Sequence, residues 1–309
     1  MYLFKRLKER FNKAVFSTVI AGMRRTPQAR LTGSRLTVLS MVQHRDVDSY
    51  LLAIKSFLRF VPAKRVVVIA DPTLTDGDRA ILRNNVSGLV LREAAEFRKP
   101  GIPVGGTWER LCAISEYVGD SYVVQLDADT VAVEPLTEVT TAIERGVAFT
   151  LGTQDVQHIQ SCAEISTWAR GRGEVGGHIQ ILAESVVDQI EGCSELRYIR
   201  GCSGFAGFPK GSFDYSRLRD ISQRMSKLLG ERWSEWGTEQ FTSNLLLASM
   251  PNFQPLSHPA YCAPHYRTEQ TVFIHFIGFV RFATPLYARV ARRVIHELRV
   301  GNHGARERR

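Results

Sequence analysis

Two carboxylates separated by one residue are the part of the sequence best suited to chemistry. Asp127 and Asp129 follow the apolar run 121–126, which has the length and composition of a buried strand. Burying two negative charges is costly unless a cation or hydrogen bonds compensate them. Carboxylate oxygens are hard ligands that suit Mn²⁺ or Mg²⁺, and such ions can bridge the oxygens of a diphosphate. The pattern therefore predicts a divalent metal at the end of this strand.

Three other interpretations of these aspartates stay open at this point. The strand followed by D-x-D-x-V resembles the first motif of haloacid-dehalogenase-like phosphatases, in which Asp127 would be the nucleophile, but the chain has no Asp-Asp pair and no G-D-x-x-x-D. A calcium loop ending at Glu138 would carry Ala132 at the position that needs glycine. The third interpretation is an Asp-rich turn that caps a helix after Pro135.

A histidine and an arginine about 150 residues later could belong to the same site. His275 lies in the apolar run 271–276, which we expect to be a strand, and Gly278 and Arg281 follow it. Imidazole nitrogen is a metal ligand, and a guanidinium group can bind two phosphate oxygens at once. A single histidine on an apolar strand is also typical of a protein core, so both roles are considered for His275.

The first half of the chain predicts the sheet that must position these groups. We expect strands at 35–43, 65–70, 88–91 and 121–126, and helices at 47–60, 76–85 and 108–118. Continuous apolar strands that alternate with helices are typical of a parallel sheet covered on both faces, in a Rossmann-like α/β unit. Ligands of such sheets bind beyond the carboxyl ends of the strands. No G-x-G-x-x-G motif and no P-loop occurs, so the usual dinucleotide and Walker-type phosphate sites are disfavoured.

The second half of the chain is less regular, and it shows no repeat and no low-complexity linker. It contains a glycine-rich tract at 200–208 and an expected helix at 239–249. We therefore predict a single domain at 35–281. A basic amphipathic N-terminal tail or helix at 1–34 and a basic C-terminal helix or tail at 282–309 would flank this domain.

The net charge of +9 is concentrated at the two ends of the chain. Residues 1–30 carry +7 and residues 281–309 carry +6, which leaves the rest of the protein at −4. Nucleic-acid binding is disfavoured, because a nucleic-acid groove would spread Lys and Arg over the folded surface. No apolar run is long enough to span a membrane. We expect a cytoplasmic protein whose N-terminal helix either lies on an anionic inner membrane face or packs on the body or a second subunit.

Two segments carry a resemblance to a known family. The run from Tyr122 to Thr130, YVVQLDADT, resembles the D-x-D strand of GT-A fold glycosyltransferases, especially glycosyltransferase family 8 and its relatives. The run FIHFIGFVR, which ends at Arg281, is similar to that family's C-terminal H-F-x-G-x-x-K, with arginine in place of lysine. The resemblance implies a Rossmann-like mixed, mostly parallel sheet flanked by helices.

The resemblance also implies roles for individual residues. Asp127, Asp129 and His275 would bind Mn²⁺ or Mg²⁺. Asp129 would also be a catalytic residue. Five further residues would contact the donor: Asp71, Arg110, Ala128, Gly278 and Arg281. Asp71 could instead belong to a turn, and Arg110 could instead be a solvated charge on a helix.

The acceptor side is implied by two weaker matches. Ser203 and Gly204 lie in a tract similar to the family's N-[ST/A]-G segment, in which Cys202 replaces the usual Asn. Glu239 and Gln240 stand where the family has the start of its D-Q helix, with Glu in place of Asp. Glu239 is therefore expected to be a base or an acceptor contact, although it could also belong to a helix cap.

The implied activity is transfer of a sugar from a nucleotide-diphosphate sugar, with a UDP-sugar expected first, to a glycan or glycolipid acceptor. Two alternatives remain. One is a haloacid-dehalogenase-like phosphatase that uses Asp127. The other is a non-catalytic protein that binds sugar nucleotides or glycans on a transferase fold, suggested by Cys202 and Arg281 departing from the family pattern.

Overall fold

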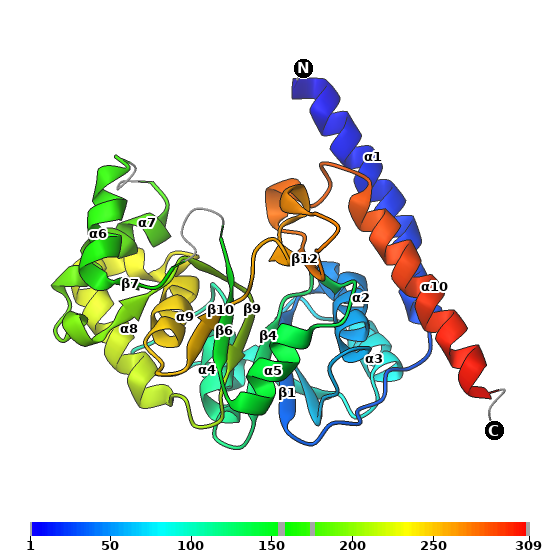
Figure 1. The fold of residues 1–309 in the computed structure, drawn as a ribbon, viewed down its shortest axis with the longest axis horizontal. Helices are drawn as coiled ribbons and strands as arrows, with labels where there is room; N and C mark the ends of the chain where they lie inside the picture. The colour runs from blue at the N-terminus through cyan, green and yellow to red at the C-terminus, as the bar shows by residue number, and fades with distance from the viewer. Residues whose placement is uncertain (1, 154–157, 174–176, 307–309) are drawn as a thin grey trace.

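A seven-stranded sheet forms the centre of the protein (Figure 1). The computed structural model describes residues 2–153, 158–173 and 177–306. The strands lie in the order β10-β6-β9-β4-β1-β2-β3, and a three-stranded sheet, β11-β12-β5, lies beside them. Helices flank the central sheet. The mixed, mostly parallel architecture expected from the sequence is confirmed.

The first half of the chain follows the expected alternation of strands and helices closely. Strands β2, β1 and β4 are parallel neighbours. The expected bounds of the second strand and of the helix after it are matched to the residue. The elements are β1 (Leu36–Val42), α2 (Val47–Leu58), β2 (Arg65–Ala70), α3 (Asp76–Asn85), β3 (Val90–Glu93), α4 (Trp108–Tyr117) and β4 (Tyr122–Leu126).

Helix packing on both faces explains why these strands are continuously apolar. In β2, Val66 and Val68 point into one hydrophobic cluster, which includes residues of α2, whereas Val67 and Ile69 point into the other, which includes residues of α4 and α9. Successive side chains of a strand point to opposite faces, so a sheet covered on both sides needs apolar residues at every position.

The second half of the chain adds the antiparallel strand β9, which lies between β4 and β6. The second sheet pairs β5 with β12 in antiparallel register, which places His275 opposite Thr130. The elements are β5 (Thr130–Ala132), α5 (Thr137–Arg145), β6 (Ala148–Gly152), β7 (Gln160–Ser161), α6 (Cys162–Gly171), α7 (Ile179–Val186), β8 (Arg197–Tyr198), β9 (Gly201–Phe208), α8 (Tyr215–Leu229), α9 (Thr238–Ala248), β10 (Phe253–Pro255), β11 (Tyr261–Cys262) and β12 (Phe273–His275).

The two ends of the chain form a pair of adjacent helices, α1 (Tyr2–Ile20) and α10 (Leu286–Arg306) (Figure 1). Tyr287 stacks on Phe16 at 3.9 Å and on Phe276 at 4.0 Å between ring centroids. Phe276 directly follows His275 in the sequence, so the helix pair supports the strand that carries this histidine. The second half of α1 therefore packs on the body, which was one of the two expectations for this segment.

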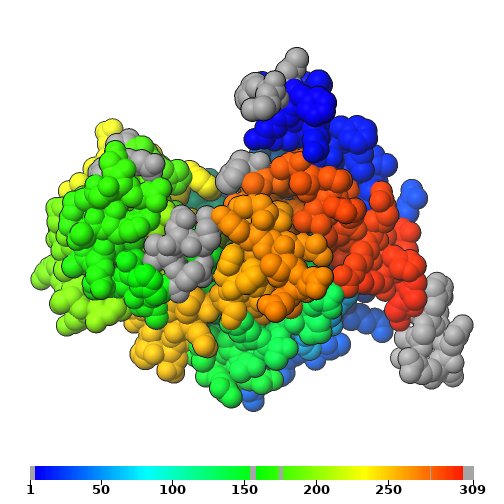
Figure 2. Space-filling model, turned by 45° about the horizontal axis from the view of Figure 1, so that its top comes forward, coloured from blue at the N-terminus to red at the C-terminus, as the bar shows by residue number. Residues whose placement is uncertain are grey.

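The first half of α1 extends beyond this contact and exposes an apolar stripe. Phe4, Leu7 and Phe11 are 75%, 55% and 69% exposed. Figure 2 shows α1 in blue and α10 in red, on the side of the molecule away from the green lobe that contains α6 and α7. Within the described ranges, no helix combines the length and the apolar character that crossing a membrane requires.

Candidate metal and donor site

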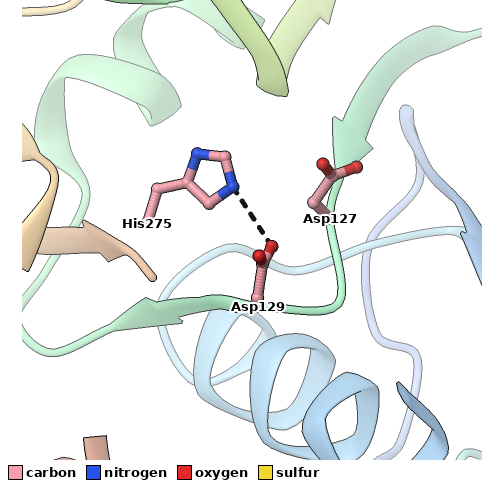
Figure 3. A group of neighbouring side chains, drawn as sticks. All are labelled: Asp127, Asp129 and His275. Atoms are coloured by element: carbon pink, nitrogen blue, oxygen red, sulfur yellow. Dashed lines mark hydrogen bonds and ion pairs between the residues drawn. The ribbon is translucent and has the colours of Figure 1, made fainter. Parts of the chain in front are cut away.

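Asp127 and Asp129 lie in the turn that connects the two sheets. The Asp127 backbone N–H donates to the Gly204 carbonyl oxygen of β9 at 2.8 Å. The Thr130 hydroxyl donates to the Asp127 carbonyl oxygen at 2.7 Å, and the chain then enters β5. Figure 3 shows the two carboxylates and the His275 imidazole grouped around this turn. The site is therefore fixed on strands of both sheets.

The three expected metal ligands come together in the structure. One ligand atom from each of Asp127, Asp129 and His275 lies within 4.8 Å of the others, in the one such group of His, Cys, Asp and Glu found among the described residues. His275 Nε2 lies 3.1 Å from Asp129 Oδ1. Asp129 and His275 are buried. Two carboxylates and an imidazole form a donor set that fits Mn²⁺ or Mg²⁺.

The ring of His275 is held from two sides by β9. Its Nδ1 lies 3.4 Å from Cys202 Sγ, so the nitrogen that faces away from Asp129 has a hydrogen-bond partner. The ring also lies against the backbone of Gly204, where a Cβ atom would be 2.2 Å from His275 Cε1. Such partners fix the orientation of a metal-ligating imidazole. Cys202, noted in the sequence only as a departure from a family pattern, thus contacts a candidate ligand.

Two arginines neutralise the two aspartates. Arg110 Nη1 donates to Asp127 Oδ1, and Arg281 Nη2 donates to Asp129 Oδ2. Arg281 also donates from Nε to the Phe276 carbonyl oxygen at 3.0 Å. Arg110 is only 3% exposed, so it is not a solvated helix charge. Both arginines that the sequence suggested for the donor site therefore lie at the aspartate pair.

Glu239 lies on the other side of Arg110. Arg110 Nη2 is 3.3 Å from both carboxylate oxygens of Glu239 and 3.4 Å from Ser203 Oγ. Glu239 is 2% exposed and accepts a hydrogen bond from the Thr107 hydroxyl at 3.0 Å. The N-cap residue of α9 is Gly237, with φ at 114°, and no side chain caps this helix. Glu239 therefore belongs to the ionic cluster rather than to a cap.

The side chain of Gln240 joins this cluster to the helical lobe. Gln240 Oε1 accepts a hydrogen bond from the Ser203 backbone N–H at 3.1 Å. Gln240 Nε2 donates to Gln180 Oε1 at 2.8 Å, and Gln180 lies in α7. The expected acceptor-side residues Ser203 and Gln240 are thus in contact with each other, and Gly204 is in contact with the metal-ligand group.

The cluster shifts the pKa of its acids in opposite directions. Burial alone would raise the pKa of Asp129, but His275 and Arg281 outweigh burial and lower this pKa to about 2. Burial raises the pKa of Asp127 and of Glu239, although Arg110 opposes both shifts. Burial would also lower the pKa of His275, but Cys202 and Asp129 raise it well above the ordinary value. Metal binding at His275 Nε2 would therefore displace a proton from the imidazole.

Three of the residues suggested for the donor lie outside the ionic cluster. Asp71 follows β2, and its Oδ1 accepts hydrogen bonds from the Thr73 backbone N–H and hydroxyl at 2.9 and 2.6 Å, so it stabilises a turn. Ala128 lies between the two aspartates and is partly buried. Gly278 is exposed and begins a short 3₁₀ turn.

Sequence reasoning missed the loop before α4. Thr107 has a φ of 73° and is the one non-glycine residue with positive φ among those described. Gly105 and Gly106 before it have φ values of 84° and 56°. The Gly-Gly-Thr sequence before a helix is a visible signal of a special turn. Its contact with Glu239 could not be read, because the two residues are 132 positions apart.

Replacing Gly204 by alanine should displace the His275 ring, because the added methyl group would overlap three ring atoms at 2.2 to 2.8 Å. We expect Gly204→Ala to weaken Mn²⁺ binding at least about tenfold, as disturbing the support of a metal ligand typically does. The measurement is Mn²⁺ titration followed by electron paramagnetic resonance. The control is Gly171→Ala, where nothing lies within 4 Å of the added atom. Equal Mn²⁺ affinity in wild type and folded Gly204→Ala protein would contradict this account of His275.

The fold is similar to those of several solved glycosyltransferases. The glycosyltransferase GlyE of Streptococcus pneumoniae TIGR4 has a TM-score of 0.50 and 12% identity, over 85% of this chain and 63% of its own. Mouse xyloside xylosyltransferase 1 has a TM-score of 0.47 and 13% identity, over 79% and 98% of the two chains. The galactosyltransferase LgtC, in complex with donor and acceptor sugar analogs, has a TM-score of 0.47 and 12% identity, over 84% of this chain and 95% of its own. No family model and no curated protein matches the sequence. The chain therefore has the fold of the GT-A glycosyltransferases.

Proposed function

We propose that the protein is a metal-dependent glycosyltransferase that uses a nucleotide-diphosphate sugar, with a UDP-sugar as the first candidate, and transfers a hexosyl group to a glycan or glycolipid. The observation that supports this most is the convergence of Asp127, Asp129 and His275 on one point at the carboxyl end of β4. Ligands of α/β sheets bind at that end. A bound Mn²⁺ or Mg²⁺ would supply positive charge to the departing nucleoside diphosphate.

The protein's own groups would orient the donor around that charge. In this proposal Arg281 leaves Asp129 and meets the diphosphate, because its guanidinium group matches two phosphate oxygens. Arg110 stays buried between Asp127 and Glu239 and holds both carboxylates in place. Asp71, Ala128 and Gly278 complete the donor side.

Glu239 and Gln240 would face the transferred sugar and its acceptor, together with Ser203 and Gly204. The pKa of Glu239 is raised by burial, which favours a role as base or as a hydrogen-bond partner of a hydroxyl group. In the phosphatase alternative Asp127 would attack phosphorus. The chain lacks the later acidic motifs of that family, which disfavours this role. In the non-catalytic alternative Cys202 and Arg281, which both contact the metal-ligand group, would serve binding alone. Tight donor binding without turnover would favour that alternative.

Turnover should depend on both the metal and Asp129. With Mn²⁺ present, we expect hydrolysis or transfer from at least one member of a panel of UDP- and GDP-sugars. Because metal-borne charge stabilisation is worth several kcal/mol, Asp129→Asn should lower kcat/KM by about 10²-fold or more. The matched control is Asp76→Asn, a fully exposed carboxylate on α3, which should behave like wild type. Wild-type rates for Asp129→Asn, or no turnover of any donor, would rule the proposal out.

We also propose that the exposed half of α1 lies on an anionic membrane surface. Phe4, Leu7 and Phe11 form its apolar stripe, and the exposed Lys5, Lys8 and Lys13 supply positive charge. The variant with all three lysines changed to glutamate should lose binding to phosphatidylglycerol vesicles. Raised salt concentration should weaken vesicle binding by the wild type for the same electrostatic reason. The control is Lys210→Glu, an exposed lysine on the body. Equal binding to neutral phosphatidylcholine vesicles would refute the electrostatic part.

A further inference from the structure

Among the residues whose side-chain exposure the structure describes, Trp236 is the one large aromatic residue outside α1 that is exposed. Its side chain is 69% exposed, whereas Trp108 and Trp233 are almost fully buried. Exposing an indole to water forgoes the free energy that burial of this large apolar side chain would provide. The hydrophobic core therefore does not explain why a tryptophan stands at this position.

Trp236 lies at the edge of the ionic cluster. It precedes Gly237, the N-cap residue of α9, and Glu239 and Gln240 follow in the first turn of that helix. The loop that contains Gly106 passes next to it, since a Cβ on Gly106 would be 3.6 Å from Trp236 Cα. The next residue of the loop, Thr107, donates a hydrogen bond to Glu239. The backbone of Trp236, the loop and the buried carboxylate thus form one continuous unit.

Two features fix this unit in place. The His178 ring meets the indole edge-on, with ring centroids 6.0 Å apart and planes at 87°, which restricts the orientation of Trp236. The loop from Gly105 to Thr107 has three successive residues with positive φ. For the non-glycine residue Thr107 this conformation is strained, and such strain is concentrated at functional sites.

We propose that Trp236, oriented by His178, is the stacking platform for a pyranose ring of the acceptor. This inference rests on the proposed transferase function and names the acceptor subsite within it. One face of a pyranose ring presents C–H groups whose partial positive charge suits the negative face of an indole. The ring's hydroxyl groups would then lie towards Glu239 and Gln240.

A small saccharide fits this surface better than a protein partner does. The adjoining loop adds only one exposed large apolar side chain, Val104, at 60% exposure. A stable protein interface buries roughly 800 Å² on each partner, with several anchoring residues. A single exposed indole at the start of the helix that carries Glu239 and Gln240 instead matches the size and the mixed polarity of one sugar ring.

The experiment uses the full chain, Mn²⁺ and the donor that the wild type hydrolyses fastest. The acceptors are p-nitrophenyl glucoside, galactoside, mannoside and xyloside. Trp236→Ala should raise the acceptor KM about tenfold. Trp236→Phe should restore most of the lost affinity, because it keeps an aromatic face. The donor KM and the rate of donor hydrolysis without acceptor should stay at wild-type values. Val300→Ala, which changes an exposed apolar residue on α10, serves as the control.

Three results would overturn the inference. The first is an unchanged acceptor KM in Trp236→Ala. The second is an equal loss of donor hydrolysis, which would place Trp236 on the donor side. The third is a wild type that self-associates on sedimentation and a Trp236→Ala variant that does not. That result would make the indole a contact between two copies of the chain. If no donor is turned over, the proposed function fails separately. Saturation-transfer NMR with the same four glycosides then decides, since binding to wild type but not to Trp236→Ala would still support the platform.

Discussion

The structure depends on how two carboxylates at the end of β4, Asp129 buried and Asp127 partly buried, are compensated. Asp127 and Asp129 lie where the parallel strands end, and each is paired with an arginine. Removing one partner of a buried ion pair typically costs about 3–5 kcal/mol, because it leaves an uncompensated charge. The role of each surrounding element is therefore described by the group that it places beside Asp127 or Asp129.

Each part of the fold brings one component to the site. The central sheet supplies the aspartates, and α4 brings Arg110 to Asp127. The small sheet brings His275 to Asp129 through the pairing of β5 with β12. Strand β9 runs between β4 and β6, and its Gly204 leaves room for the imidazole. The stack of Phe16, Tyr287 and Phe276 connects the terminal helices to the same strand, so the ends of the chain are part of the architecture of the site.

The sequence predicts the parts of this arrangement that depend on local patterns. Helix α3 is found at its expected residues because Thr75 and Asp78 form a capping box, and β2 because its apolar run is buried on both faces. The burial of Arg110 could not be predicted, because it depends on Glu239, which is 129 positions away. The contact of Cys202 with His275 likewise depends on the register of strands that are distant in the sequence.

We propose that Asp127, Asp129 and His275 bind a metal ion that in turn binds a nucleoside diphosphate. Calorimetric titration of UDP and GDP, with and without Mn²⁺, tests this proposal. The account predicts that Mn²⁺ strengthens binding of at least one of the two by about tenfold or more, a difference of about 1.4 kcal/mol. Equal affinity with and without Mn²⁺, or no binding of either nucleotide in its presence, would contradict it.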